Sequence, residues 1–178
     1  MAAFLSRLRR LEPDQYYYTA SEVHITVLSL FTATIDHGPF FAQRARYVSA
    51  ADTALRKAGP MRIDFAGVTA STGTVMIQGF FVDDVLNDLR DALRRELRAR
   101  GLGAGLDQRY RLRTAHMTAV RFRSPLRDSR RFAAALEQAR ERPFGATTIR
   151  SLSLVENDWY MSHHATEIVK RYPLVPAR

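Results

Sequence analysis

The sequence contains no cysteine, and its 27 basic residues include only two lysines, Lys57 and Lys170. The lack of cysteine excludes a disulfide framework, a thiolate nucleophile, and zinc or iron–sulfur sites that use cysteine ligands. No stretch approaches the roughly 18 apolar residues of a membrane-spanning helix. The segment from Met1 to Arg10 also lacks the hydrophobic run of a signal peptide. We therefore expect a cytoplasmic protein without membrane association.

Basic residues outnumber acidic ones by 27 to 18, so the formal net charge of the 178 residues is +9. A basic balance favours polyanionic ligands, and the planar guanidinium suits phosphate oxygens. The other interpretation is that arginine richness reflects genomic base composition. The arginines 90, 94, 95, 98 and 100 fit that interpretation as a solvated helix face. The charge thus favours a nucleotide or RNA ligand without requiring one.

Two short segments, 92 residues apart, carry the same arrangement of a histidine and a threonine among apolar residues. They are Val23-His24-Ile25-Thr26-Val27 and Ala115-His116-Met117-Thr118-Ala119. Side chains two positions apart on a strand point to one face. Each segment is therefore expected to present an imidazole and a hydroxyl together, while its apolar residues anchor the opposite face. Two such strands side by side predict a symmetric site of two histidines and two threonines.

Chance accounts poorly for this repeat. With this composition, a histidine has an apolar-flanked serine or threonine two positions on with a frequency of roughly 3%. Two such matches among the five histidines are expected in roughly 1% of comparable chains. A single copy fits a core histidine with a satisfied hydrogen bond equally well. The pair favours a functional site.

The order motif strand, helix, strand, hairpin, strand occurs twice, which indicates an internal duplication. The hairpin turns are expected at 71–73 and 156–158. A helix at 83–100 joins the two copies, with its core face at Val85, Leu86, Leu89, Leu93 and Leu97. The other expected elements are a strand at 22–31, a helix at 41–58 and strands at 62–70 and 74–82 in the first copy, and a strand at 114–123, a helix at 129–140 and strands at 147–155 and 159–163 in the second.

These elements predict an α+β fold. We expect a single bilobal domain over residues 1–178, with lobe one at roughly 15–82, the linking helix at 83–100 and lobe two at roughly 107–174. Each lobe is expected to hold a mainly antiparallel sheet with helices outside. The two motif strands would then face a central cleft.

Two histidines on either side of a phosphate can divide the work of an in-line displacement. One takes a proton from the attacking hydroxyl and the other gives one to the leaving oxygen, and imidazole ordinarily titrates near neutrality. Thr26 and Thr118 can donate hydrogen bonds to the nonbridging phosphate oxygens, which stabilises the developing charge. This chemistry requires no metal and no cofactor. The near symmetry leaves open which of His24 and His116 is the base.

On their duplicated units, His24-Ile25-Thr26-Val27 and His116-Met117-Thr118-Ala119 resemble the paired signature of the two-histidine (2H) phosphoesterase superfamily, which includes the bacterial 2′-5′ RNA ligase-like enzymes. The resemblance extends over roughly Glu22 to Pro173 through motif order. It implies a bilobal α+β fold and metal-independent hydrolysis of 2′,3′-cyclic phosphates or related 2′-linked esters on RNA ends or nucleotides. No pattern for base recognition accompanies it, so the substrate and the choice between hydrolysis and ligation stay open.

Arg121 completes a His-x-Thr-x-x-Arg pattern, similar to the form in the RNA ligase-like branch, and the resemblance implies a phosphate contact. The residue follows Thr118 by three positions, so strict alternation places its side chain on the face opposite His116. Only a twist or a bulge in the strand would bring it to the motif face.

Two tyrosines are candidates for stacking on a base. Tyr18 precedes the first motif in a run of three tyrosines, for which the alternative is a half-buried strand. Tyr160 occupies the position in the last hairpin that matches Met76 in the first copy.

The sequence thus favours a monomeric phosphoesterase acting on an RNA end or a nucleotide. One alternative is a non-catalytic RNA- or nucleotide-binding module with the same cleft, for which the net charge would suffice. Another is a scaffold domain with a histidine-containing core, which predicts no phosphate affinity and strong destabilisation when the histidines are replaced.

Overall fold

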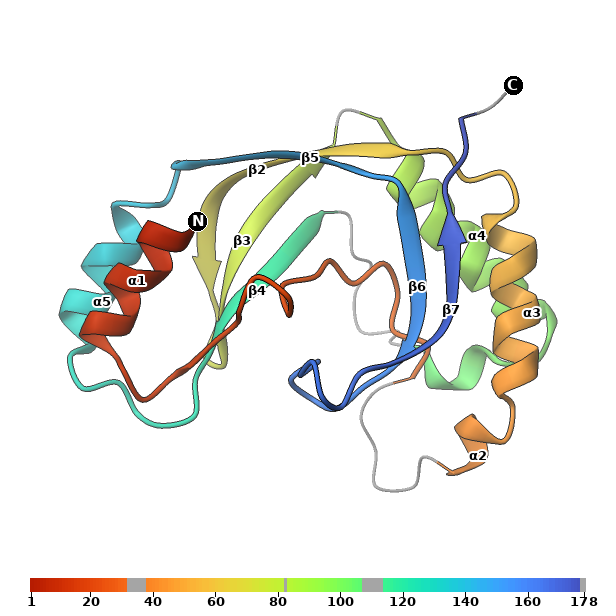
Figure 1. The fold of residues 1–178 in the computed structure, drawn as a ribbon, viewed down its shortest axis with the longest axis horizontal. Coiled ribbons are helices and arrows are strands. Elements are labelled where there is room, and N and C mark those ends of the chain that lie inside the picture. The colour runs from red at the N-terminus through yellow and green to blue at the C-terminus, as the bar shows by residue number, and fades with distance from the viewer. Residues whose placement is uncertain (32–37, 82, 107–113, 177–178) are drawn as a thin grey trace. The chain divides into compact units, whose positions relative to one another are not determined.

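The computed structural model describes residues 1–31, 38–81, 83–106 and 114–176. The fold is α+β with antiparallel sheets, as the sequence predicts (Figure 1). The helical elements are α1 (Ala2–Leu11), α2 (Gly38–Phe41), α3 (Arg44–Leu55), α4 (Val85–Ala99), the short 3-10 turn η1 (Gly103–Gly105) and α5 (Ser129–Glu137). The strands are β1 (Tyr16–Tyr17), β2 (Met61–Ala70), β3 (Thr74–Phe81), β4 (Ala115–Arg121), β5 (Pro143–Ile149), β6 (Ser151–Glu156) and β7 (Glu167–Pro173).

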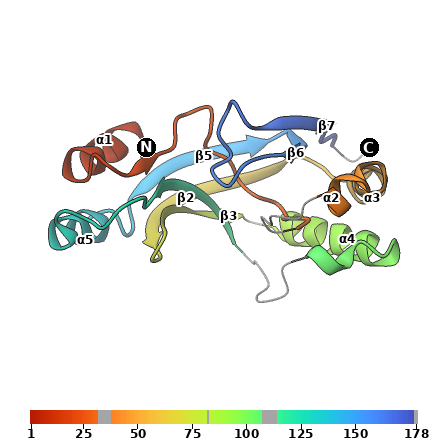
Figure 2. The same cartoon turned by 90° about the horizontal axis from the view of Figure 1, so that it is seen from below.

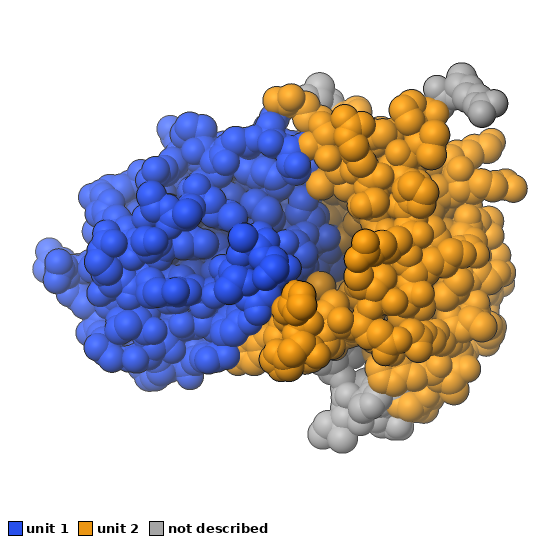
Figure 3. Space-filling model, viewed as in Figure 1, with its two compact units in different colours: residues 1–26, 63–80, 114–147 blue, residues 27–62, 81–113, 148–178 orange. Residues whose placement is uncertain are grey.

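The chain divides into two compact units, which Figure 3 colours separately. Unit 1 comprises residues 1–26, 63–80 and 114–147, and unit 2 comprises residues 27–62, 81–113 and 148–178. Each unit therefore takes segments from both halves of the sequence. The predicted lobes at 15–82 and 107–174 do not coincide with these units, because strands from both halves join one sheet.

Most of the larger sheet lies in unit 1, with the strand order β1-β4-β3-β2-β5. Its strand β4 pairs antiparallel with β1 and with β3. The two faces of the sheet differ, because Ile63, Val75, Ile77 and Val120 are buried whereas the alternate positions of β3 are mostly half-buried. Such a pattern gives a sheet one face in the core and one face that stays accessible in part.

α1 and α5 lie side by side in both ribbon views (Figures 1 and 2). Their apolar side chains Phe4, Leu8 and Phe132 are buried in the core of unit 1. The Phe132 ring meets that of Phe122, the residue after β4, edge to face at 5.8 Å between centroids. Helix α1 was not predicted, although Phe4 and Leu8 have the i, i+4 spacing of a buried helix face.

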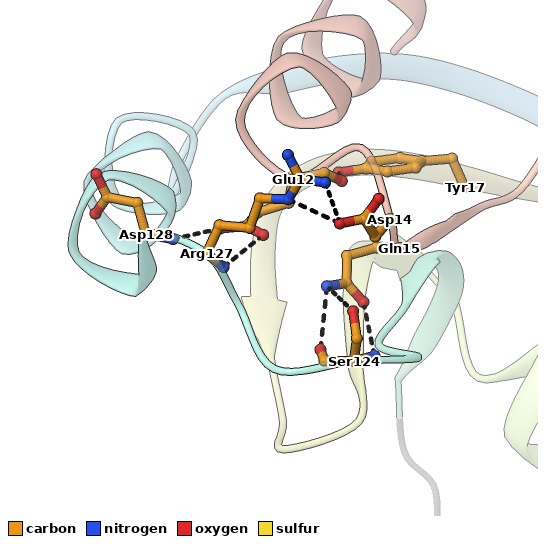
Figure 4. A network of polar contacts seen from close by, with 7 residues as sticks. All are labelled: Glu12, Asp14, Gln15, Tyr17, Ser124, Arg127 and Asp128. Atoms are coloured by element: carbon orange, nitrogen blue, oxygen red, sulfur yellow. Dashed lines mark hydrogen bonds and ion pairs between the residues drawn. The ribbon is translucent and has the colours of Figure 1, made fainter.

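Two buried polar side chains after α1 hold the segment between β4 and α5 (Figure 4). The carboxylate of Glu12, which is fully buried, accepts hydrogen bonds from the backbone N–H groups of Arg127 (2.9 Å) and Asp128 (2.8 Å). The Gln15 amide donates to the carbonyl and hydroxyl oxygens of Ser124 at 3.1 and 3.2 Å. Because buried polar groups are costly when unpaired, these bonds fix the path of the chain beyond β4.

In unit 2, α3 and α4 pack against each other. The smaller sheet of this unit consists of β6 and β7, paired antiparallel. Lys170 of β7 forms an ion pair with Asp52 of α3 at 2.7 Å. One buried cluster of this helical core consists of Tyr47, Ala50, Leu97, Leu102 and Leu106. None of the described helices combines the length and the hydrophobicity that crossing a bilayer requires.

Arg90 corrects one expectation about the linking helix. The residue was predicted to lie on a solvated face, but it is 1% exposed and lies on the buried face of α4 with Leu86 and Leu93. Its Nε donates to the carbonyl oxygen of Val27 at 2.9 Å. Burial, with the nearby charge of Arg94, lowers the pKa of Arg90 to about 10. The i, i+4 spacing from Leu86 was the available signal.

Most of the predicted elements are confirmed, with ends that differ by a few residues, but the strand expected at 147–155 is divided between the end of β5 and β6, which belong to different sheets. The hairpin of β2 and β3 turns at Ser71, whose N–H donates to the carbonyl oxygen of Thr74 at 2.9 Å. The linking helix is α4, and the helices expected at 41–58 and 129–140 are the shorter α3 and α5.

Two predicted strands are absent from the described residues. The segment expected as a strand at 22–31 makes only one isolated bridge, at Ile25, within its described part. The strand expected at 159–163 lies in the connection between β6 and β7, and the last strand is β7 instead. Alternation of residue types does not reveal whether a partner strand is available, and pairing is what defines a strand.

Candidate active site

His116 and Thr118 lie on the half-buried face of the sheet in unit 1. Both belong to β4, where they stand opposite Gln78 and Met76 of β3. The intervening Met117 points to the other face. The second motif is therefore placed as predicted, with imidazole and hydroxyl on a common face.

The first motif joins the same face through one antiparallel bridge between Ile25 and Met117. In an antiparallel pairing, the residue before a bridged position lies opposite the residue after its partner, and the residue after it lies opposite the residue before its partner. His24 therefore stands opposite Thr118, and Thr26 opposite His116. Opposed side chains share a face and have Cβ atoms about 5 Å apart. All four motif side chains are half-buried, so they are accessible to a ligand in part.

The orientation of His24 is set by its own backbone surroundings. Its Nδ1 lies 2.7 Å from the carbonyl oxygen of Glu22. Because a carbonyl oxygen can only accept, Nδ1 carries the hydrogen of this bond, and Nε2 is the ring atom left to exchange a proton. A similar bond orients the catalytic imidazole in many hydrolases.

The turn before His24 is held by the Glu22 side chain. One carboxylate oxygen accepts from the N–H and the hydroxyl of Thr19, both at 2.9 Å, and the other accepts from the Tyr16 hydroxyl at 2.8 Å. Burial, followed by the hydrogen bond to Glu22, raises the pKa of Tyr16 to about 12. The carboxylate thereby fixes the loop whose carbonyl oxygen orients His24.

A bulge in β4 decides the place of Arg121. Thr118 pairs with Met76 and Val120 pairs with Val75, so Ala119 is an extra residue in β4. After this bulge Arg121 stands opposite Thr74, which shares a face with Met76 by alternation. Arg121 is thereby on the same face as His116 and Thr118. The bulge that Arg121 needs in order to reach the motif face is therefore present in β4.

The two predicted stacking tyrosines lie in different surroundings. Tyr18 is 3% exposed, and its ring meets those of Tyr16 and His24 edge to face with centroids 5.0 and 6.1 Å apart. A ring so enclosed offers little surface to a base, so this burial argues against the predicted stacking role for Tyr18. Tyr160 lies between β6 and β7 in unit 2, and its stacking role stays a prediction.

The motif face also carries Tyr16, which belongs to the run of three tyrosines, and Arg123, which was not predicted to lie there. The Arg123 guanidinium lies over the Tyr16 ring, 4.5 Å from its centroid. No local signal pointed to this contact, since it depends on the pairing of β1 with β4. Among the described residues, no three His, Asp or Glu side chains come together in a way that could hold a metal ion.

The fold occurs in several solved structures. One described as TT0787 of Thermus thermophilus has a TM-score of 0.66 and 14% identity, and the match covers 97% of this chain and 90% of that one. A structure described as a phosphoesterase has a TM-score of 0.58 and 15% identity, with 98% and 91% covered. E. coli LigT complexed with ATP has a TM-score of 0.52 and 12% identity, with 98% and 90% covered. These likenesses define the LigT-like α+β fold.

Residues 1–159 match the model of the 2′-5′ RNA ligase superfamily, a span that includes both His-x-Thr segments. The protein belongs to the 2′-5′ RNA ligase superfamily. The resemblance to the 2H phosphoesterases is thereby confirmed. Among curated protein sequences, none matches this chain.

Proposed function

We propose that this protein is a phosphoesterase that hydrolyses 2′,3′-cyclic phosphates, or related 2′-linked phosphodiesters, at RNA ends or on nucleotides. The observation that carries the proposal is the bridge between Ile25 and Met117, since it gathers both His-x-Thr pairs on one face. Family membership supports the proposal. The family is named for 2′-5′ RNA ligases, and one structure of the same fold is described as a phosphoesterase.

In the proposed reaction, water attacks the phosphorus of a cyclic phosphate. One of His24 and His116 takes a proton from the water, and the other gives a proton to the ribose oxygen as its bond to phosphorus breaks. The products are one phosphomonoester and one free ribose hydroxyl. His24 is oriented for proton exchange at Nε2, because its Nδ1 donates a hydrogen bond to the carbonyl oxygen of Glu22.

Three further side chains stabilise the charge on the phosphate. Thr26 and Thr118 stand opposite the two histidines and donate hydrogen bonds to the nonbridging oxygens. Arg121 supplies a permanent positive charge on the same face. These groups do for the phosphate what a metal ion does in other phosphoesterases, so the reaction proceeds without one.

The test is hydrolysis of nucleoside 2′,3′-cyclic phosphates and of a cyclic-phosphate-ended RNA in excess EDTA. His24→Ala and His116→Ala should each lower kcat by about a hundredfold to ten-thousandfold. The matched control is His163→Ala, an exposed histidine of unit 2 that is not followed by threonine two positions on. Equal activity of His163→Ala and His116→Ala would contradict the proposal.

The second candidate is a binding module for RNA or nucleotides that does not turn them over. The net charge of +9 favours it, because phosphate affinity needs only positive charge and donors. It predicts that the unaltered protein binds the same ligands without product forming. This candidate is excluded if the unaltered protein forms hydrolysis product in EDTA and neither His24→Ala nor His116→Ala does.

A further inference from the structure

Tyr18 lies where the two halves of the candidate site meet. It follows β1 directly, and its N–H donates to the carbonyl oxygen of Ala119, the bulged residue of β4, at 3.1 Å. Alternation places its side chain with that of Tyr16 on the face that carries the motifs. The residue is 3% exposed, so its contacts are with protein groups.

Its side chain contacts both motif segments. The Tyr18 hydroxyl oxygen accepts a hydrogen bond from Nε of Arg121 at 2.8 Å. The Tyr18 ring meets the His24 ring at 6.1 Å between centroids, with 66° between the ring planes. One stiff, buried side chain therefore spans the histidine of the first motif and the arginine after the second.

We propose that Tyr18 is a positioning residue, which holds the Arg121 guanidinium and the His24 imidazole in a fixed relation for binding phosphate. This inference rests on the proposed function, in which His24 moves a proton and Arg121 binds the phosphate. A long arginine side chain otherwise samples many rotamers, and a bond at Nε fixes the plane of its guanidinium. The hydroxyl thus acts through Arg121, and the ring acts through His24.

The neighbouring Tyr17 provides a matched control. It is also buried, at 5% exposure, but it points to the opposite face of β1, where its hydroxyl donates to the carbonyl oxygen of Glu12 at 2.9 Å. Tyr17→Phe and Tyr18→Phe each remove one buried hydroxyl and keep the ring. Tyr17→Phe leaves the contacts of Arg121 and His24 intact.

The experiment compares Tyr18→Phe, Tyr17→Phe, Arg121→Ala and the double variant Tyr18→Phe with Arg121→Ala. Thermal unfolding checks that each variant is folded. The readouts are kcat and KM for a nucleoside 2′,3′-cyclic phosphate, and the Kd of inorganic phosphate measured by NMR titration. Tyr18→Phe should raise KM and Kd by about tenfold with a smaller change in kcat, while Tyr17→Phe leaves all three unchanged.

The double variant tests whether the hydroxyl acts through the arginine. If it does, Tyr18→Phe adds no further loss in the Arg121→Ala background, so the two effects are not additive. Arg121→Lys probes the same pair from the other side, because lysine keeps the charge and lacks the planar donors; it should show the same loss as Tyr18→Phe.

The outcomes separate the two proposals. If the unaltered protein is active and Tyr18→Phe matches Tyr17→Phe in KM and Kd, the role of Tyr18 is overturned while the proposed function stands. Additive losses in the double variant overturn it as well. If the unaltered protein neither turns over the substrate nor binds phosphate, the proposed function fails and the role of Tyr18 fails with it.

Discussion

Ile25 and Met117, 92 residues apart in the sequence, form a single antiparallel backbone bridge. This one pairing gives the motifs opposite directions, so that each histidine stands across from the threonine of the other motif. The two motifs are therefore related by a local two-fold axis, which places His24 on His116 and Thr26 on Thr118. Such symmetry suits a phosphate whose attacking and leaving oxygens lie on opposite sides.

The threonine hydroxyls are expected to act on the reaction more than on stability. Thr118→Val keeps the shape of the side chain and removes its donor, so kcat should fall by about a hundredfold, as after loss of an oxyanion-type donor. Thr69→Val, at an exposed position of β2, is the control. Steady-state kinetics and urea unfolding measure both effects. Unaltered kcat in Thr118→Val would remove the hydroxyl from the mechanism.

The pH dependence of kcat/KM should be bell-shaped around neutrality. An acid and a base that work together must hold opposite protonation states, and imidazole ordinarily changes charge in this range. The two limbs belong to the pair of histidines, since coupled groups titrate together. The measurement is initial rates at subsaturating substrate. A profile that stays flat from about pH 5 to about pH 8 argues against paired histidines.

Glu12 should contribute far more to stability than its neighbour Asp14. Glu12→Gln replaces one carboxylate oxygen by an NH₂ group, which cannot accept a hydrogen bond from the backbone N–H that it faces. The loss should lower the free energy of unfolding by about 3 kcal/mol. Asp14 pairs with Arg127 at the surface, with side chains 51% and 60% exposed, so Asp14→Asn should cost less than about 1 kcal/mol. Urea unfolding compares the two. Equal losses would show that the buried bonds of Glu12 add no more than a surface ion pair.

Alkaline pH should destabilise the fold through Tyr16 and Tyr17. Burial raises the pKa of each to about 12 from the ordinary 10.0. Between these values the folded protein keeps protons that the unfolded chain releases, so the stability present below pH 10 is lost as the pH rises toward 12. Thermal unfolding at about pH 9 and about pH 11, with tyrosinate absorbance, tests this. The double variant Tyr16→Phe with Tyr17→Phe should show a smaller drop in melting temperature between the two pH values. The same melting temperature of the unaltered protein at both pH values would contradict the prediction.

Much of the candidate site could be proposed from the sequence because its pattern is local. His24 with Thr26, and His116 with Thr118, share a face wherever the chain is extended, and no distant residue is needed to see this. The hairpin of β2 and β3 was predictable for the same reason, since its turn residues adjoin the strands.

Arg121 shows what the sequence could not decide. Alternation in β4 placed it on the face opposite His116, and only the extra residue Ala119, set by pairing with β3, reversed that. Arg90 was misjudged in the same way, because its burial depends on what packs against α4. The expected strand at 159–163 lacked a partner among the described strands, and the strand at Glu167–Pro173 pairs with β6 instead.

The sequence by itself determined the two His-x-Thr pairs and the α+β class, because residue types and short-range periodicity encode them. The tertiary structure alone decided that the motifs run antiparallel, that a bulge moves Arg121 to their face, and that Tyr18 contacts both Arg121 and His24. These relationships depend on the register between segments about 100 residues apart. Register is fixed by the burial of whole faces, and no short stretch of sequence carries that information.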